Sequence, residues 1–524
     1  MRLRRYCFLF IVFIMAIPLV SCRSGHEVDE PPQLVSVTVD EAAVVLSKGG
    51  MAELHFSVKD VLFRFSGAPD LVLSPTSSGH DGLFGIAELR QDVQEGHYVA
   101  VVKDFGGAEE YSVETRLGVR VKPGSDALVL SDPFEVRNTG TSPSGLDTGL
   151  PVVYLNTEGG ARIKSKVDWV PATLRIEGEQ HACSVRGRGN TTWEWPKKPY
   201  AIKLESKASL FGMPAHKRWV LLANFMDRTL MRNIVAMKVA SLTSLDWTPS
   251  CVSVELVLNG EHQGNYLLIE QVRVDKDRVN VDKNEGILLE LDFHYDNEVQ
   301  WIEPLGRCVQ RSDGIPFGIK YPDAEDLGAD RFREIKNYVS EVSAAIYGPS
   351  SADPEVGYAK YLDVDSFIDY WIVFEVMGNH ELGNPGSVFM HRDKGGKLTA
   401  GPCWDFDWGV LSYKTSPAAR TGLINSRAIW YAKLFTDPAF RAKVKARFNE
   451  LLPALKTIPE FMEDTEEKLA RSAKLNFAMW NPAGDATMNG GSIVNGDENI
   501  TFHEASERLR SIFEERLEVI RKCL

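Results

Sequence analysis

Hydrophobic and polar residues alternate in short runs over the first part of the chain. Between residues 34 and 137 the runs LVSVTVD, AELHFSV, HYVAVVKDF and DALVLSDPFEV are separated by clusters of Gly, Pro, Ser and Asp. Alternation places every second side chain on the same face of a strand, and this spacing of runs is typical of an all-β sandwich. We therefore predict an Ig-like β-sandwich over residues 34–137, which serves as a spacer or a binding module.

The pattern changes after NTGTSPSGLDTG, residues 138–149, whose composition predicts a linker. The runs PVVYLNT, ATLRIEG and PYAIKLES predict strands, and VSVELVL and NYLLIEQVRV predict a hairpin around Asn259-Gly260, although NGEHQ separates the two runs. Asp365 is expected to be the N-cap of one predicted helix. Residues 150–524 are thus predicted to form an α+β domain with a helical C-terminal half; its helices are expected at 228–242, 327–346, 365–377, 437–455, 458–475 and 503–522.

The N-terminus has the pattern of an export signal. MRLRR is cationic, YCFLFIVFIMAIPLVS is apolar, and the segment ends in LVSC, which resembles a bacterial lipobox. We predict a lipoprotein signal peptide over residues 1–22, acylation of Cys22, and a polar tether over residues 23–33; an ordinary secretory signal is the alternative. The protein would then be anchored by lipid to a bacterial membrane and face an extracytoplasmic space, at the outer membrane or cell surface.

Charge and cysteine content narrow the functional classes. The chain has 72 acidic and 59 basic residues and a net charge of −13, without the clustered basic excess that duplex binding needs, so a nucleic-acid partner is not expected. Five cysteines follow Cys22 without a CxxC pair, which argues against a zinc site and a dense disulfide framework. One long-range disulfide stays possible among Cys183, Cys251, Cys308, Cys403 and Cys523.

The first candidate for chemistry is the segment RGRGNTTWEWPKKPYAIKL, residues 186–204. Its glycines suit a tight loop whose backbone amides bind phosphate, and its cations suit polyphosphate. Lys203 lies on a predicted strand after this loop, much as a protein kinase has a strand lysine after its glycine loop. Either Glu255 or Glu270 could pair with Lys203, as a glutamate pairs with the kinase lysine. An ordinary basic hairpin turn is the alternative. Further along, Asp227 is interpreted either as a site residue or as a helix N-cap.

The second candidate is GPCWDFDWG, residues 401–409. If this segment is a strand, Asp405 and Asp407 project from one face and the aromatic residues from the other. Two neighbouring carboxylates repel each other unless a cation lies near them, and Mg²⁺ prefers one or two carboxylates with phosphate and water. The pattern predicts a metal–nucleotide site, with an exposed strand face as the alternative.

Several motifs together resemble the CotH kinase family. RGRGN, PKKPYAIKL, LFGMP, WVLLANFMDRTLMRN, VELVLNGEHQGNYLLIEQV, GILLELD, IKYP and GPCWDFDWG occur in the family's order over roughly residues 150–524. The resemblance implies an atypical protein-kinase-like fold and phosphorylation of Ser or Thr with ATP and Mg²⁺ or Mn²⁺. It also implies that Asp405 and Asp407 bind the metal and that Arg186, Arg188, Lys198 and Lys203 lie on the nucleotide side; Asn190 of the same loop is a further predicted nucleotide contact.

One departure from the family concerns the catalytic base. Spore-coat kinases have an aspartate about two dozen residues before the DxD motif, where this chain has GNHELGNPGSVFMHRDKGGKL. Glu381 could accept a hydroxyl proton there, whereas Asn384 could only orient a group or bind metal. The predicted catalytic residues are therefore Lys203, Asp405 and Glu381, acting on a protein substrate that the sequence does not name. A non-catalytic surface scaffold or adhesin that binds a protein or glycan, and a metal-dependent hydrolase, are the alternatives.

Overall fold

The computed structural model describes most of the chain from residue 34 onwards: residues 34–46, 50–60, 69–76, 83–91, 96–105, 110–120, 127–139, 148–294, 298–309, 311–480, 495–497 and 499–524. The predicted signal peptide with Cys22, the tether and residues 140–147 of the predicted linker lie outside these ranges. In the described part, no helix has the length and apolar character needed to cross a bilayer. The predicted domain limits stay predictions.

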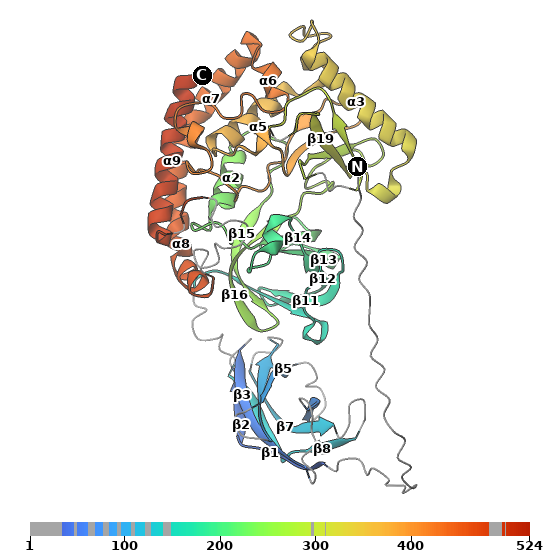
Figure 1. Ribbon diagram of the computed structural model, residues 1–524, viewed down its shortest axis with the longest axis vertical. Coiled ribbons are helices and arrows are strands. Elements are labelled where there is room, and N and C mark those ends of the chain that lie inside the picture. The colour runs from blue at the N-terminus through green and yellow to red at the C-terminus, as the bar shows by residue number, and fades with distance from the viewer. Residues whose placement is uncertain are drawn as a thin grey trace, which may run out of the picture.

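The first strands form two sheets that share one core (Figure 1). Alternate residues of each sheet point inward, among them Leu54 and Phe56 from one and Val113 and Leu117 from the other. This is the packing that the alternating runs predict. One sheet has the order β1 (Leu34–Val39), β3 (Met51–Asp60), β6 (His97–Asp104), β5 (Phe84–Gln91); the other has β2 (Ala43–Leu46), β9 (Phe134–Thr139), β7 (Glu110–Arg120), β4 (Leu71–Pro75), with β8 (Leu128–Leu130) beside β7.

The next strands close into a barrel, which occupies the middle of Figure 1. Its order is β10 (Val152–Thr157), β11 (Val170–Ile176), β12 (Glu179–Gly187), β13 (Tyr200–Ala208), β14 (His216–Leu222), β16 (Glu261–Glu270), β15 (Cys251–Leu258), and parallel pairing of β15 with β10 completes it. The predicted hairpin is confirmed as β15–β16. Its loop is the pair Asn259-Gly260, with φ of 50° and 77°. Two positive φ values define the type I′ turn that Asn-Gly favours, so the strands extend closer to the turn than the apolar runs indicated.

This hairpin turn also contacts the sandwich. Beside the turn, the side-chain amide of Asn156 on β10 donates to the carbonyl of Phe105, just after β6. A Cβ at Gly260 would lie 2.8 Å from the carbonyl oxygen of Asp104 and would collide with the Lys103 side chain. Only glycine therefore fits where the barrel meets the sandwich.

The remainder of the chain contains a 5-stranded sheet and the helices that make up most of its C-terminal part. The sheet has the order β18 (Gln300–Glu303), β19 (Ile315–Tyr321), β17 (Ile287–Leu291), β20 (Val388–Arg392), β21 (Thr399–Ala400). The chain is thus α+β as predicted, with sheets in its N-terminal part and helices towards its C-terminus (Figure 1). The α-helices are α1 (Thr191–Glu194), α2 (Arg232–Ala240), α3 (Ala329–Tyr347), α4 (Tyr358–Tyr361), α5 (Val364–Val376), α6 (Tyr431–Leu434), α7 (Pro438–Leu455), α8 (Ile458–Met479) and α9 (Phe502–Cys523), and the short 3₁₀ helices are η1 (Glu158–Gly160), η2 (Ala324–Asp326), η3 (Glu381–Gly383) and η4 (Pro417–Arg420).

Two predicted helix starts need correction. α5 begins one residue earlier than expected, and its N-cap is Asp363, whose carboxylate accepts from the Ser366 amide, rather than Asp365. α2 begins at Arg232 instead of residue 228, because the preceding residues form a turn around the Asp227 carboxylate. That carboxylate accepts from the Arg232 amide at 2.9 Å, so Asp227 does provide a hydrogen-bond acceptor for a backbone amide in the first turn of the helix.

Helix α5 is the centre of the helical part. It is mostly apolar, and its residues from Ser366 to Val376 are buried on every side of the helix. At its C-terminal end Glu375 forms an ion pair of 2.8 Å with Arg516 of α9, and both side chains are fully buried. The two helices are therefore joined by a buried charge pair. Replacing either residue by a neutral one would leave the charge of the other buried and unpaired.

The cysteines of the described chain form no disulfide. Cys183, Cys251, Cys308, Cys403 and Cys523 are all free. The long-range bridge that the sequence left open is therefore absent among these five.

Candidate functional site

The GPCWDFDWG segment is not the strand predicted from its alternation. β21 ends at Ala400, residues 401–407 have irregular structure, and Asp405 has a φ of 65°. A positive φ is uncommon for a residue other than glycine and is typical of functional sites. Trp404 and Phe406 are buried as expected, but Trp408 is 38% exposed, so the aromatic residues do not form a single packing face.

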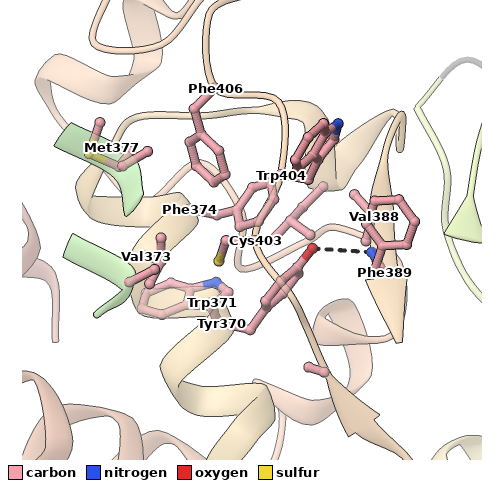
Figure 2. Packing of buried hydrophobic residues seen from close by; sticks show 14 of the residues in the cluster. Tyr370, Trp371, Val373, Phe374, Met377, Val388, Phe389, Cys403, Trp404 and Phe406 are labelled. Atoms are coloured by element: carbon pink, nitrogen blue, oxygen red, sulfur yellow. Dashed lines mark hydrogen bonds between the residues drawn. The ribbon is translucent and has the colours of Figure 1, made fainter. Parts of the chain in front are cut away.

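The buried aromatic residues Trp404 and Phe406 nevertheless anchor this segment in the hydrophobic core (Figure 2). The ring of Phe406 lies 4.8 Å from that of Phe374 on α5, and its amide donates to the side-chain oxygen of Asn233 on α2 at 2.8 Å. The buried guanidinium of Arg232 donates to the Val410 carbonyl at 2.9 Å. Asn233 and Arg232 therefore position both sides of the aspartate pair.

A cavity of about 640 Å³ lies above this segment. Its lining comes from the end of β12 and the loop after it, from β17 and β19 of the 5-stranded sheet, and from η3. The structure brings six of the predicted site residues to its walls: Arg186, Arg188, Asn190, Glu381, Asp405 and Asp407. Segments separated by more than 200 positions in the sequence thus meet at one site.

The carboxylates in this cavity repel one another. Burial, then the charges of Asp405 and Asp227, raise the pKa of Asp407 to about 8, and Arg188 opposes the increase. Burial, then Asp405 and Asp407, hold the pKa of Glu381 well above its usual range. Without a cation these two acids therefore retain protons, and a cation bound beside them would favour their charged forms.

The glycine loop has the tight geometry that its sequence predicts. Gly189 has a φ of 84°, and a Cβ there would collide with the hydroxyl of Thr192. The backbone amide of Arg188 donates to the Pro199 carbonyl at 3.3 Å. The guanidinium group of Arg188 lies 5.8 Å from the centre of the Trp404 ring. The loop therefore holds a guanidinium between the aspartate segment and the cavity.

Two predicted nucleotide residues lie outside the cavity lining. Lys198 donates to the Trp193 carbonyl at 2.6 Å. Lys203 is exposed on β13, opposite Ser184 of β12 and Arg218 of β14. Lys203 thus lies on the outer face of the barrel.

The predicted pairing of Lys203 with a hairpin glutamate is wrong. Glu255 is fully buried and bonds His262 at 2.6 Å, whereas Glu270 accepts from the Ser250 amide at 2.9 Å and lies 3.5 Å from Arg278. Glu270 pairs with Trp219 of the barrel core and therefore points inward, whereas Glu255 alternates with the core residues Val254 and Leu256 and is buried on the outer face with His262 as its partner.

Sequence reasoning missed other residues of the cavity. Glu290 and Lys320 form an ion pair of 3.2 Å across β17 and β19, and Asp292 follows β17 into the lining. Arg273 and His380 also face the cavity. The motif GILLELD could have indicated these acids, because Glu290 and Asp292 are two residues apart and so share one face at a strand end. The motif IKYP contains Lys320, the ion-pair partner of Glu290.

The donor set fits Mg²⁺ accompanied by phosphate. Within the described ranges, no three His, Cys, Asp or Glu side chains gather closely enough to hold a metal by themselves. The cavity instead provides the carboxyl groups of Asp405 and Asp407, which line it together with Arg186 and Arg188. Mg²⁺ commonly uses one or two protein carboxylates and takes its other ligands from phosphate and water.

The chain is thus a mixed α+β protein with a cavity lined by acids and arginines. The family model described as CotH kinase protein matches residues 185–520, and the chain belongs to the CotH kinase family. This match contains every lining residue of the cavity. No curated protein matches the chain.

Among solved structures, the similarities cover about a fifth to about two fifths of the chain. Domains 4 and 5 of the S-layer protein SbsC are 15% identical over 20% of this chain and 53% of theirs, with a TM-score of 0.14. The ZirS C-terminal domain is 17% identical over 26% of this chain and 93% of its own, with a TM-score of 0.15. A marsupial T cell receptor is 14% identical over 37% of this chain and 97% of its own, with a TM-score of 0.17. The chain spans about half of the SbsC fragment, and at these TM-scores the similarities carry no argument about fold or function.

Proposed function

We propose that this protein binds ATP with Mg²⁺ or Mn²⁺ and transfers the γ-phosphoryl group to a Ser or Thr hydroxyl of a protein. The supporting observation is that one cavity collects Arg186 and Arg188, the aspartates Asp405 and Asp407, and the candidate base Glu381. Its volume of about 640 Å³ is within the usual range for small-ligand sites. Membership of the CotH kinase family supports the same reaction class.

Each group has a distinct role in the proposal. Arg186, Arg188 and the backbone around Gly189 neutralise and orient the phosphates. Asp405 and Asp407 hold the metal, which when bound neutralises phosphate charge. Lys203, predicted from sequence to be catalytic, lies outside the cavity lining and has no role in this proposal.

Glu381 accepts the proton of the acceptor hydroxyl. A bond forms between the hydroxyl oxygen and the γ-phosphorus, and the bond from that phosphorus to the bridging oxygen of ADP breaks. Burial and the neighbouring acids hold the pKa of Glu381 well above its usual range, and positive charge bound at Asp405 and Asp407 would favour the ionised form that acts as a base. Positioning and charge neutralisation supply most of the rate enhancement in phosphoryl transfer.

The proposal includes the predicted location. Acylation of Cys22 would anchor the chain to a bacterial membrane, with the kinase region in an extracytoplasmic space. ATP would then have to be supplied on that side of the membrane.

The test is a transfer assay on residues 23–524 with ATP labelled in its γ-phosphate and Mg²⁺ or Mn²⁺. We expect label in the protein or in a model substrate, and its loss in Asp405→Ala. Asp464→Ala, at an exposed position of α8, is the matched control and retains the label. A folded sample that neither binds ATP nor transfers label favours a non-catalytic scaffold, and release of product from an ester without nucleotide favours a hydrolase.

A further inference from the structure

Basic residues gather on the outer face of the barrel beside the cavity. β12 pairs with β13 so that Ser184 lies opposite Lys203, and β13 pairs with β14 so that Lys203 lies opposite Arg218. Their strand neighbours Val185, Ile202 and Trp219 are in the barrel core. Alternation therefore puts Arg186, Lys203 and Arg218 together on the outside.

An aromatic ring organises two of these cations. The guanidinium carbons of Arg186 and Arg218 lie 4.6 Å and 5.1 Å from the centre of the Trp169 ring. Stacking on an aromatic ring limits the motion of a guanidinium group while leaving its N–H groups at the ring edge free to bind anions. We call the set Trp169, Arg186, Lys203, Arg218 and Arg273 the cationic wall.

The cationic wall carries more positive charge than its neighbours neutralise. After burial, the positive charge of Arg273 lowers the pKa of both Arg186 and Arg218. Among the carboxylates nearby, Asp323 lies 3.4 Å from Arg273. Asp168 precedes Trp169, and Glu205 follows Lys203 along the strand. The cavity that Arg186 and Arg273 line also contains Asp292, Glu298 and Glu290, the last paired with Lys320, so the excess of positive charge lies at Lys203 and Arg218 outside that lining.

The wall is continuous with the proposed active site. Arg186 and Arg273 line the same cavity as Glu381 and Asp405. Lys203 and Arg218 do not line it, so they extend the positive surface beyond the space available to a nucleotide. A ligand that reached them from the cavity would have to be extended.

We propose that the cationic wall binds an acidic segment of the protein substrate and thereby presents a neighbouring Ser or Thr to Glu381. This inference rests on the proposed function, because it names the substrate class of that site. Carboxylates of an extended segment fit paired guanidinium groups. Complementary charge at the rim of a site also selects the partner and speeds its association.

The test measures peptide binding without nucleotide or metal. The probes are a fluorescent peptide with one serine among glutamates and aspartates, and a matched peptide with lysines in their place. Fluorescence anisotropy with residues 23–524 is expected to show binding of the acidic peptide only, weakening as ionic strength rises. The variant Lys203→Gln/Arg218→Gln should weaken that binding about fivefold or more, in line with the loss of two partly exposed charge contacts.

The control is Lys443→Gln/Lys445→Gln on the exposed side of α7, which lowers the charge by the same amount and should bind the peptide like the wild type. ATP–Mg²⁺ binding, followed by thermal shift, should be unchanged in both variants. The inference is overturned if the two variants bind the acidic peptide equally, if Lys203→Gln/Arg218→Gln loses ATP binding instead, or if the wall binds anionic vesicles and not the peptide. Peptide binding without phosphate transfer would instead contradict the proposed function and leave the docking surface in place.

Discussion

Replacing Asp407 by asparagine should change how stability depends on pH. In the folded protein burial and neighbouring acids raise the pKa of Asp407 to about 8, from an ordinary value of 3.8. The folded chain then holds a proton that the unfolded chain releases between these two values, so this carboxyl makes the protein less stable as pH rises through that window. Asp407→Asn removes the effect because asparagine does not titrate.

The size of the effect follows from proton linkage. One proton held only by the folded state changes the free energy of unfolding by about 1.4 kcal/mol per pH unit. From about pH 5 to about pH 7, the stability of Asp407→Asn relative to the wild type should therefore rise by roughly 3 kcal/mol. Any effect of asparagine on packing is independent of pH and drops out of this comparison.

The assay is urea unfolding in a chelating buffer, followed by tryptophan fluorescence. All 11 tryptophans lie between Trp169 and Trp480, so the signal reports the region after the sandwich. Asp464→Asn, at an exposed site of α8, should follow the wild-type pH dependence. If the curves for Asp407→Asn and the wild type are parallel between about pH 5 and about pH 7, Asp407 is not held neutral by its surroundings and the electrostatic account of the cavity is wrong.

Three further predictions concern the charge pair, the hairpin turn and the base. Arg516→Met should lower stability by about 3–5 kcal/mol in the same urea assay, because it leaves the Glu375 charge buried and unpaired; adding Glu375→Leu should not restore the loss, since that carboxylate also accepts from the Ile424 and Asn425 amides. Gly260→Ala should lower the thermal midpoint more than Gly212→Ala, because both glycines have positive φ but only the first would place its Cβ against the end of β6; equal midpoints would contradict this contact. Glu381→Gln should keep ATP–Mg²⁺ binding but lose at least about a hundredfold in phosphate transfer, as expected for removal of a general base; unchanged transfer would exclude Glu381 from that role.

Local patterns in the sequence were sufficient for most elements. The alternating runs predicted the sandwich strands, Asn259-Gly260 predicted the β15–β16 turn, and the helix periodicity predicted α3, α5, α7, α8 and α9 to within a few residues at most ends. These features depend on neighbours a few positions apart. For the same reason the pattern could not show that Asp405 adopts a positive φ, because contacts of Phe406 with α2 and α5 determine the path of that segment.

The site could be predicted only in part. The glycine loop, the aspartate pair and Glu381 were identified from sequence, and the structure places them around one cavity. The pairing of Lys203 with Glu255 or Glu270 was wrong because Glu270 points into the barrel beside Trp219 and Glu255 has His262 as its partner, and local spacing reveals neither contact. Arg273 and Lys320 were missed because only the meeting of the barrel and the 5-stranded sheet brings them to the cavity.

The most direct test of the central claim is calorimetric titration of residues 23–524 with ATP in the presence of Mg²⁺. We predict binding at a single site by the wild type, and an affinity lower by at least about tenfold in Asp405→Asn/Asp407→Asn, because the aspartates no longer hold the metal that neutralises the phosphates. Asp464→Asn should bind as the wild type does. Equal affinity in the wild type and the double variant, or no binding by the folded wild type, would contradict the account.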